Sequence, residues 1–94
     1  MKIWAKCIHH NKIHKDVVQE FTLARPSDIT GWYEVLTPIC KVLDIARPLM
    51  LSKHLRELAQ FSRTTFYEGD FMETIDFDKF LMEILPEEKK RNRM

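Results

Sequence analysis

Glycine, proline and cysteine are scarce in this sequence. Its 94 residues include two glycines and four prolines, which leaves little room for long loops, because these residues dominate turns. The two cysteines, Cys7 and Cys40, are fewer than a secreted disulfide scaffold of this size normally carries. Both stand within apolar patterns, so we expect two buried, reduced thiols.

Long hydrophobic runs and an excess of one charge are also missing. No stretch approaches the roughly 20 apolar residues that cross a membrane, and the opening residues lack the apolar run of a signal peptide. The 15 basic and 14 acidic residues leave a formal charge of +1. The chain as a whole is therefore not drawn to nucleic acid or to anionic lipid, and we expect a cytoplasmic protein with no membrane partner.

Short motifs of known catalytic chemistry are absent as well. The sequence has no P-loop, no G-x-G-x-x-G, no G-x-S-x-G and no C-x-x-C. Cys40 and His54 have the side chains of a nucleophile and a base, but Cys40 falls on an apolar helical stripe, where a thiol is inert. We expect no cofactor and a protein that acts by binding rather than by catalysis.

The length predicts a single domain, because two halves of this chain would each be too small to bury a core. With 45% hydrophobic residues, the composition is that of a globular protein. We place the domain at residues 1–85 and expect residues 86–94, six of which are charged, to form a disordered tail.

Residues 2–23 predict a β-hairpin. Apolar residues alternate with polar ones from Lys2 to Ile8, and a second run rich in β-forming residues spans Ile13 to Leu23. Asn11 lies in the polar break between them and tolerates the left-handed backbone of a tight turn. The alternation slips around Lys15 and Asp16, which indicates a bulge there.

A long amphipathic helix is predicted next. Ser27 or Asp28 is suited to cap its start, and its apolar residues recur at steps of three and four: Ile29, Trp32, Tyr33, Leu36, Ile39, Cys40 and Leu43. Pro38 either kinks this helix or splits it into two. We favour one kinked helix, because the apolar stripe continues in phase across the proline.

The second half of the sequence predicts shorter elements. Leu49–Leu51 is typical of a buried strand, Ser52 is suited to cap a helix over residues 53–60, and residues 62–67 and 77–85 have strand character. The predicted fold class is α+β: an N-terminal β-hairpin, one long kinked helix, one short helix and about three further short strands. These strands form a mixed or antiparallel sheet with the helices on one face.

Three histidines on the hairpin, His9, His10 and His14, are candidate metal ligands, because imidazole is the commonest transition-metal ligand. A structural zinc site needs four protein ligands, and no cysteine or carboxylate stands at ligand spacing beside them. The competing interpretation is a solvated polar turn.

A carboxylate-rich stretch follows the strand at residues 62–67 and consists of Asp70, Glu73, Asp76 and Asp78. Oxygen ligands of this kind suit a hard cation such as Mg²⁺ or Ca²⁺. The stretch lacks an EF-hand pattern, and its interleaved aromatic residues are typical of core anchors. A solvated acidic turn is therefore the competing interpretation.

A basic group is the main candidate for a binding site and consists of Ser52, Lys53, His54, Arg56 and Arg63. Its first members fall at the start of the predicted short helix, where free amides and the helix dipole favour an anion. The alternative is that these cations pair with Glu57, Glu68 or Asp70 and solvate one face. Nucleic acid is a weaker possibility, because no nucleic-acid-binding motif accompanies the group.

The run from Leu43 to Phe80 carries a resemblance. It contains LDIARP, LSKH, the segment from Glu57 to Phe66 that ends in FSRTTF, DFMET and IDFDKF. In these segments the chain resembles a group of short bacterial proteins of uncharacterised function. The resemblance implies an α+β intracellular domain and implies no activity, cofactor or site.

Together these patterns favour a non-catalytic protein-interaction domain. We expect it to self-associate through a sheet edge or through exposed aromatic residues such as Trp4 and Tyr67. The alternative is an anion-binding or nucleic-acid-binding module that uses the basic group between Ser52 and Arg63.

Overall fold

The structure is a computed structural model that describes residues 1–86. Along this part of the chain the order of elements is β-hairpin, two α-helices, strand, short 3-10 helix and strand. Their bounds are β1 (Lys2–His9), β2 (Lys12–Glu20), α1 (Ile29–Leu43), α2 (Ser52–Phe61), β3 (Arg63–Tyr67), η1 (Glu68–Asp70) and β4 (Lys79–Leu85).

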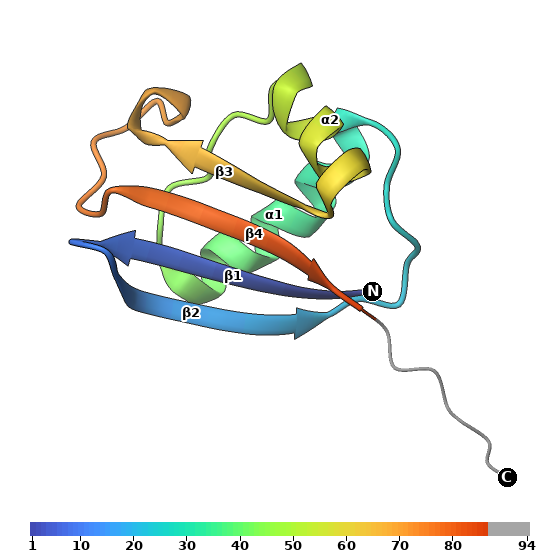
Figure 1. Ribbon diagram of the computed structural model, residues 1–94, viewed down its shortest axis with the longest axis horizontal. Helices are drawn as coiled ribbons and strands as arrows, with labels where there is room; N and C mark the ends of the chain where they lie inside the picture. Colours follow the sequence, from blue (N-terminus) through green and yellow to red (C-terminus); the bar gives the residue numbers. More distant parts are fainter. Residues whose placement is uncertain (87–94) are drawn as a thin grey trace, which may run out of the picture.

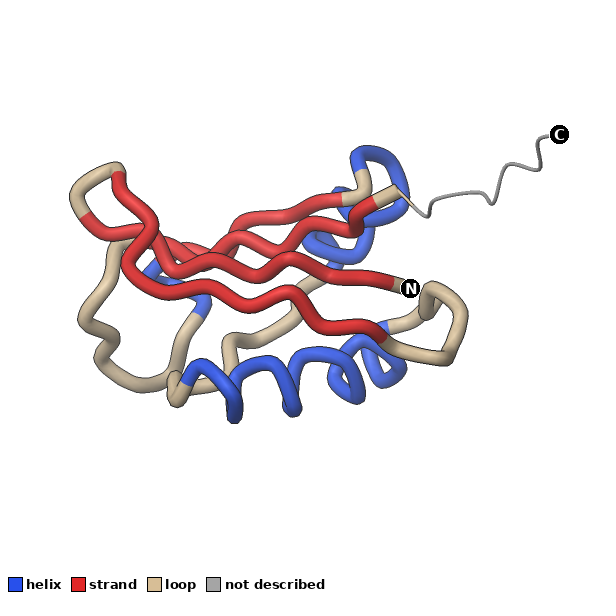
Figure 2. Tube along the Cα trace, turned by 90° about the horizontal axis from the view of Figure 1, so that it is seen from below, coloured by secondary structure: helices blue, strands red, loops and turns tan. Residues whose placement is uncertain are grey.

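The strands form one four-stranded antiparallel sheet in the order β2-β1-β4-β3 (Figure 1). Helix α1 lies across one face of this sheet, α2 packs beside β3 at its edge, and the opposite face carries no further layer of described chain (Figures 1 and 2). The α+β class is thus confirmed, and the sheet is antiparallel. β2 and β3 are its two edges, and the last strand, β4, lies between β1 and β3.

The hairpin turn sits at His10 and Asn11, which both have positive φ angles (54° and 64°). Two successive left-handed residues match the twist of the flanking strands, which is why a two-residue loop is sufficient here. The pairing shifts where Cys7 faces Lys15 and Ile8 faces Ile13, so that β2 carries one extra residue. The bulge is therefore real but lies slightly earlier than the sequence predicted.

The core lies between the sheet and α1. Ile3, Ala5 and Cys7 point inward from β1, and Phe80 and Met82 point inward from β4. These are the inward positions that strict alternation predicts for a sheet with one covered face. From α1 the buried residues are Trp32, Val35, Leu36, Ile39, Cys40 and Leu43. The predicted stripe is thus confirmed in five of its seven residues, with Val35 added, while Ile29 and Tyr33 are half-buried.

Helix α1 runs without a break from Ile29 to Leu43, with Pro38 inside it. The Asp28 side chain caps its start by accepting a hydrogen bond from the Gly31 N–H (2.8 Å). Asp44 ends it in the left-handed conformation. The prediction of one helix is thus confirmed, with Asp28 of the two candidate residues as its cap, and the alternative of two separate helices is wrong. The kink expected at Pro38 stays a prediction.

The segment Leu49–Leu51 is not a strand, and the described sheet has two strands after the hairpin rather than about three. Its three N–H groups bond to other partners. Leu49 N–H donates to the carbonyl of Asp70 (2.8 Å), Met50 N–H to the Tyr33 hydroxyl (2.9 Å) and Leu51 N–H to His54 Nδ1 (2.9 Å). These side-chain and loop acceptors replace the sheet ladder that an apolar run predicts.

Two further points concern the limits of the described chain. The predicted tail at residues 86–94 lies outside the described residues except for Pro86. Neither of the two described helices has the length and apolar content that a membrane span requires.

Candidate functional site

The structure separates the members of the basic group. Lys53 and Arg63 line one hollow of about 300 Å³ between α2 and β3. Ser52 is the first residue of α2 rather than its cap, because the helix is preceded by Leu51 in extended conformation. Ser52 and Arg56 are exposed, and neither lines this hollow. The expected cap at Ser52 is therefore wrong.

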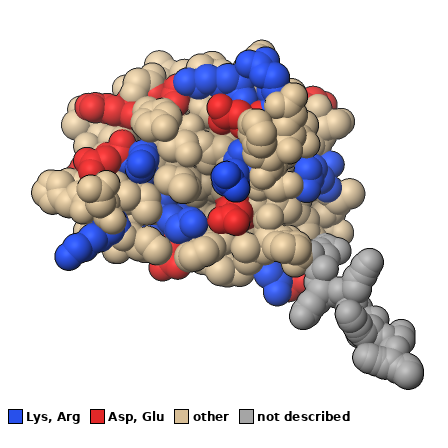
Figure 3. Space-filling view, in the orientation of Figure 1, with Lys and Arg blue, Asp and Glu red and all other residues tan. Residues whose placement is uncertain are grey.

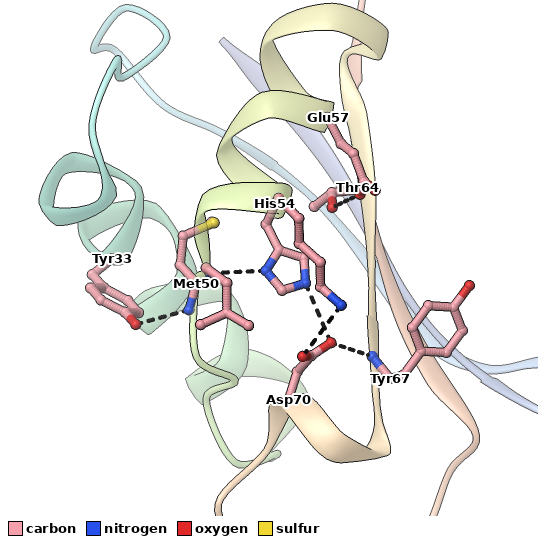
Figure 4. Close-up of polar contacts among 9 residues, drawn as sticks. Tyr33, Met50, His54, Glu57, Thr64, Tyr67 and Asp70 are labelled. Carbon is pink, nitrogen blue, oxygen red and sulfur yellow. Dashed lines mark hydrogen bonds and ion pairs between the residues drawn. The ribbon is translucent and has the colours of Figure 1, made fainter.

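His54 lies in the interior, with none of its surface exposed. Its ring packs on Phe66 at a centroid distance of 4.2 Å. Nδ1 accepts the N–H of Leu51, which makes the side chain the cap of α2 (Figure 4). A neutral ring that accepts at Nδ1 must carry its proton on Nε2, and Nε2 points to Asp70 Oδ2 at 3.3 Å. The imidazole thus faces protein groups and not the surface beside Lys53.

Asp70 is the acceptor that organises this region. Its Oδ2 also accepts the N–H of Tyr67 (2.9 Å), and its Oδ1 lies 3.8 Å from Lys53 Nζ. The carboxylate is almost fully buried, yet it joins α2, β3 and η1 through these three contacts. Burial lowers the pKa of His54 from its ordinary value, and the nearby Asp70 opposes that shift in part.

The free edge of β3 borders the same hollow. In the antiparallel ladder, Ile84 N–H donates to the Ser62 carbonyl (2.7 Å), so Ser62, Thr64 and Phe66 direct their backbone groups to β4 and the alternate residues direct theirs outward. Tyr67 N–H is taken by Asp70. Within residues 1–86, the N–H and C=O groups of Arg63 and Thr65 face away from the sheet without a backbone partner.

The hollow along this edge has both apolar and charged walls. Its lining residues are Lys53, Glu57, Phe61, Arg63, Thr64, Thr65 and Tyr67. Phe61 is 59% exposed and Tyr67 is 54% exposed, which is high for aromatic side chains. The Thr64 hydroxyl donates to the Glu57 carboxylate (2.5 Å), which places Glu57 level with the middle of β3. We call this hollow and the adjacent strand edge the β3 groove.

The open face of the sheet carries charges of both signs, interspersed rather than gathered (Figure 3). Lys6 Nζ lies 3.7 Å from the centre of the Trp4 ring and 3.4 Å from Glu83 Oε1. Trp4 Nε1 donates to Asp16 (2.8 Å). These groups satisfy one another across neighbouring strands, so the face lacks the single-sign patch that a phosphate backbone requires.

The hairpin histidines lie close together without forming a recognisable metal site. His9 stacks on His10 at a centroid distance of 3.9 Å and meets His14 edge-on at 6.2 Å. The His10 N–H donates to Asp78 (2.8 Å), and this bond lowers the pKa of the Asp78 carboxyl. Among the described residues, no three or more histidine, cysteine or acidic side chains are placed to hold a metal ion. The geometry gives no support to a site at His9, His10 and His14.

The acidic stretch is also divided by the fold. Asp70 points inward to His54, whereas Asp78 lies at the hairpin turn, 3.5 Å from His9 Nδ1. Asp70 thus contacts α2, whereas Asp78 contacts the hairpin turn. Two of the four carboxylates therefore do not share one cation site, which supports the interpretation as an acidic turn.

Both cysteines are buried and free, as expected. Burial raises the pKa of Cys7 to about 11 and that of Cys40 to about 12. A thiol that stays protonated in this way is a poor nucleophile, which agrees with the interpretation of both as core residues.

Sequence reasoning named Lys53 and Arg63, and Glu57 as a pairing partner of the cations, but it missed Phe61 of the β3 groove. The available signal was the pattern around Ser62: a helix ending in an aromatic residue, followed at once by a strand of five residues. Such a short connection holds the helix end close to the strand. Whether that strand is an edge, however, depends on the strand order, which the sequence does not display.

Comparison of the chain with protein-family models, with curated proteins and with solved structures finds no match. The resemblance to short bacterial proteins over residues 43–80 therefore stays a prediction.

Proposed function

We propose that this protein is a non-catalytic interaction module that binds an extended segment of another polypeptide along the β3 groove. The segment adds to the sheet as a new edge strand, a recognition mode in which backbone hydrogen bonds supply affinity and flanking side chains supply specificity. One observation carries the proposal: the outward backbone groups of Arg63 and Thr65 border an open hollow flanked by the exposed side chains of Phe61 and Tyr67.

The other sheet edge, β2, is less suited to such an addition. Met1 and Phe21 exchange backbone hydrogen bonds (2.8 and 2.7 Å), so by alternation Asp16, Val18 and Glu20 present the free groups of that edge. Charged side chains and a bulge are devices that natural sheets use to discourage strand addition, and β2 carries both. β3 carries no bulge, and Arg63 is its one charged residue.

The anion-binding alternative receives less support. Lys53 already lies 3.8 Å from the Asp70 carboxylate, and Glu57 lines the same hollow. An anion at this place would meet two carboxylates along with two cations. Nucleic acid binding at the basic group stays a prediction without a supporting contact.

The experiment is a peptide selection with two matched proline variants. A displayed library of random twelve-residue peptides is selected against the wild-type protein, and binding of the selected peptides is measured by fluorescence anisotropy. Thr65→Pro removes the outward N–H of the proposed binding edge without removing a bond to β4, so we expect binding to weaken at least about tenfold. Backbone amide exchange at Arg63 and Thr65 should slow in the complex.

Val18→Pro is the control, because it removes an outward N–H from the other edge and should leave peptide binding unchanged. Thermal unfolding of both variants checks that the fold is retained. A library that yields no binder, or binders that Thr65→Pro does not affect, would overturn the proposal.

A further inference from the structure

We infer that the β3 groove binds a second copy of this chain, in a symmetric dimer whose two β3 strands pair antiparallel about a two-fold axis at Thr65. The inference rests on the proposed function, because it names the partner for the same edge. Each copy contributes the β3 edge, the α2 residues that line the hollow, and the exposed Phe61 and Tyr67. A two-fold interface requires that one surface complement itself, and the β3 groove does so in three respects.

The first respect is the backbone. In an antiparallel pair centred on Thr65, the Thr65 N–H of each copy meets the Thr65 carbonyl of the other, and the Arg63 N–H meets the Tyr67 carbonyl. The second bond of that pair, from the Tyr67 N–H to the Arg63 carbonyl, is not made, because the Tyr67 N–H already donates to Asp70. All outward N–H groups of Arg63 and Thr65 are thereby satisfied in both copies.

The second respect is the charge along α2. Lys53 contacts Asp70, which binds the Tyr67 N–H, so Lys53 lies level with the end of β3. Glu57 bonds to Thr64 and lies level with its beginning. The two-fold axis at Thr65 exchanges these levels, so that Lys53 of one copy faces Glu57 of the other, twice over.

Charge also selects this register over its neighbour. An axis at Thr64 would again pair outward backbone groups, those of Arg63 with those of Thr65. It would, however, place the two Thr64 side chains and their bonded Glu57 carboxylates opposite each other. Like charges in such positions repel, whereas the axis at Thr65 separates them and brings each to a lysine.

The third respect is on the open face of the sheet. Arg63 and Tyr67 both point to that face, because Thr64 and Phe66 between and beside them point to the core. In the Thr65-centred pair, Arg63 stands directly opposite Tyr67 of the second copy. A guanidinium over a tyrosine ring is favourable, and the symmetry supplies it twice. The two sheets then continue into one another.

The first experiment measures the association state. Sedimentation equilibrium of the full chain should show a monomer–dimer equilibrium, and Thr65→Pro should raise its dissociation constant about a hundredfold, since the proline ring blocks the central pair of hydrogen bonds. Val18→Pro, on the other edge, should leave the constant unchanged. Circular dichroism and thermal unfolding report whether each variant is folded.

The second experiment reverses the charge at Lys53 or at Glu57. If these residues only stabilised the fold, mixing the two variants would not restore their association. In a homodimer of Lys53→Glu, the substituted side chain of each copy faces Glu57 of the other, so two acids meet twice. In a homodimer of Glu57→Lys, the substituted side chain of each copy faces Lys53 of the other, so two amines meet twice. Each variant alone should dimerise about tenfold more weakly than the wild type, because two exposed pairs become repulsive. An equimolar mixture should form a heterodimer at wild-type strength, since both facing pairs then attract.

Three results would overturn the inference: a strict monomer at millimolar concentration, a dimer that Thr65→Pro leaves intact, or a mixture that associates no better than its components. The first of these leaves the proposed function standing if the selected peptides still bind the edge. A Thr65→Pro variant that loses peptide binding but still forms the dimer would overturn the inference and leave the proposed function standing.

Discussion

At the scale of single residues, His54 is the side chain on which the most contacts depend. It has no exposed surface, accepts the N–H of Leu51, approaches Asp70 and packs on Phe66. A buried polar ring is tolerated only when its polar atoms have partners. Its role in the described structure is to fasten the start of α2 to the end of β3, on the inner side of the β3 groove.

Substitution of His54 separates these contributions. His54→Ala removes both nitrogens and leaves a cavity beside Phe66, so the free energy of unfolding should fall by about 3 kcal/mol. His54→Asn keeps an acceptor near the position of Nδ1, and His54→Gln keeps a donor near that of Nε2. Urea unfolding should place both variants between wild type and His54→Ala, and equal loss in all three would show that ring packing alone matters.

Lowering the pH should destabilise the protein through His54. Burial keeps the pKa of His54 in the folded state below the ordinary value of 6.5. Between pH 6.5 and that lower pKa, the imidazole is protonated in the unfolded chain but neutral in the folded one. The unfolding free energy therefore falls as the pH decreases through 6.5, with a slope of at most about 1.4 kcal/mol per pH unit from this residue. Stability is restored above pH 6.5, where both states are neutral.

The measurement compares urea unfolding of wild type and His54→Asn between pH 7.5 and 5. The groups that face the ring, Asp70 from η1 and Lys53 and Glu57 from α2, are unchanged in the variant. The wild type should lose more stability over this interval than the variant does. Parallel curves for the two proteins would contradict the assignment to His54.

At the scale of elements, α1 retains an interior proline at a cost. Pro38 lacks the N–H that would donate to the carbonyl of Glu34, and an interior proline costs up to about 3 kcal/mol. Glu34 is exposed, so water can satisfy part of what is lost. Pro38→Ala should raise the unfolding free energy by about 1 kcal/mol, less than the full cost because alanine also gives the unfolded chain more freedom. Thermal unfolding checks this, and a lower melting temperature would mean that the ring is needed for packing.

The elements differ in how far the sequence predicts them. The hairpin and α1 follow from alternation and from helical periodicity, because each is long enough to show its period several times. Leu49–Leu51 shows no period at all, and three apolar residues fit a strand as well as an anchored loop. What decides the outcome is the hydroxyl of Tyr33 and the ring of His54, which take the N–H groups of Met50 and Leu51.

The candidate site was predictable only in part, for a related reason. Charge and helix position pointed to Lys53, His54 and Arg63 together, but the rotation of α2 about its own axis turns His54 inward and leaves Lys53 at the groove. The apolar stripe of so short a helix is ambiguous by one position. The edge of β3 arises from the order of strands, which depends on long-range pairing rather than on local residues.

At the scale of the whole molecule, the layers divide the surface into unequal parts. One face of the sheet is covered by α1, and the other is open but internally satisfied by pairs such as Lys6 with Trp4 and Glu83 (Figures 2 and 3). The unpaired backbone groups of the described sheet lie at its two edges, and the β3 edge adjoins a groove in which helix side chains can select a partner. Recognition is therefore concentrated on one side of the molecule.

The position of β4 also bears on how the protein is made. This strand is the last described element in the sequence but occupies an inner place in the sheet, where it pairs with β1 along one side and β3 along the other. On a translating ribosome, the hairpin and β3 must wait as separate pieces until residues 79–85 have left the exit tunnel. Until then β1 and β3 both have unpaired edges, the kind of exposure that makes a partly folded chain prone to aggregation.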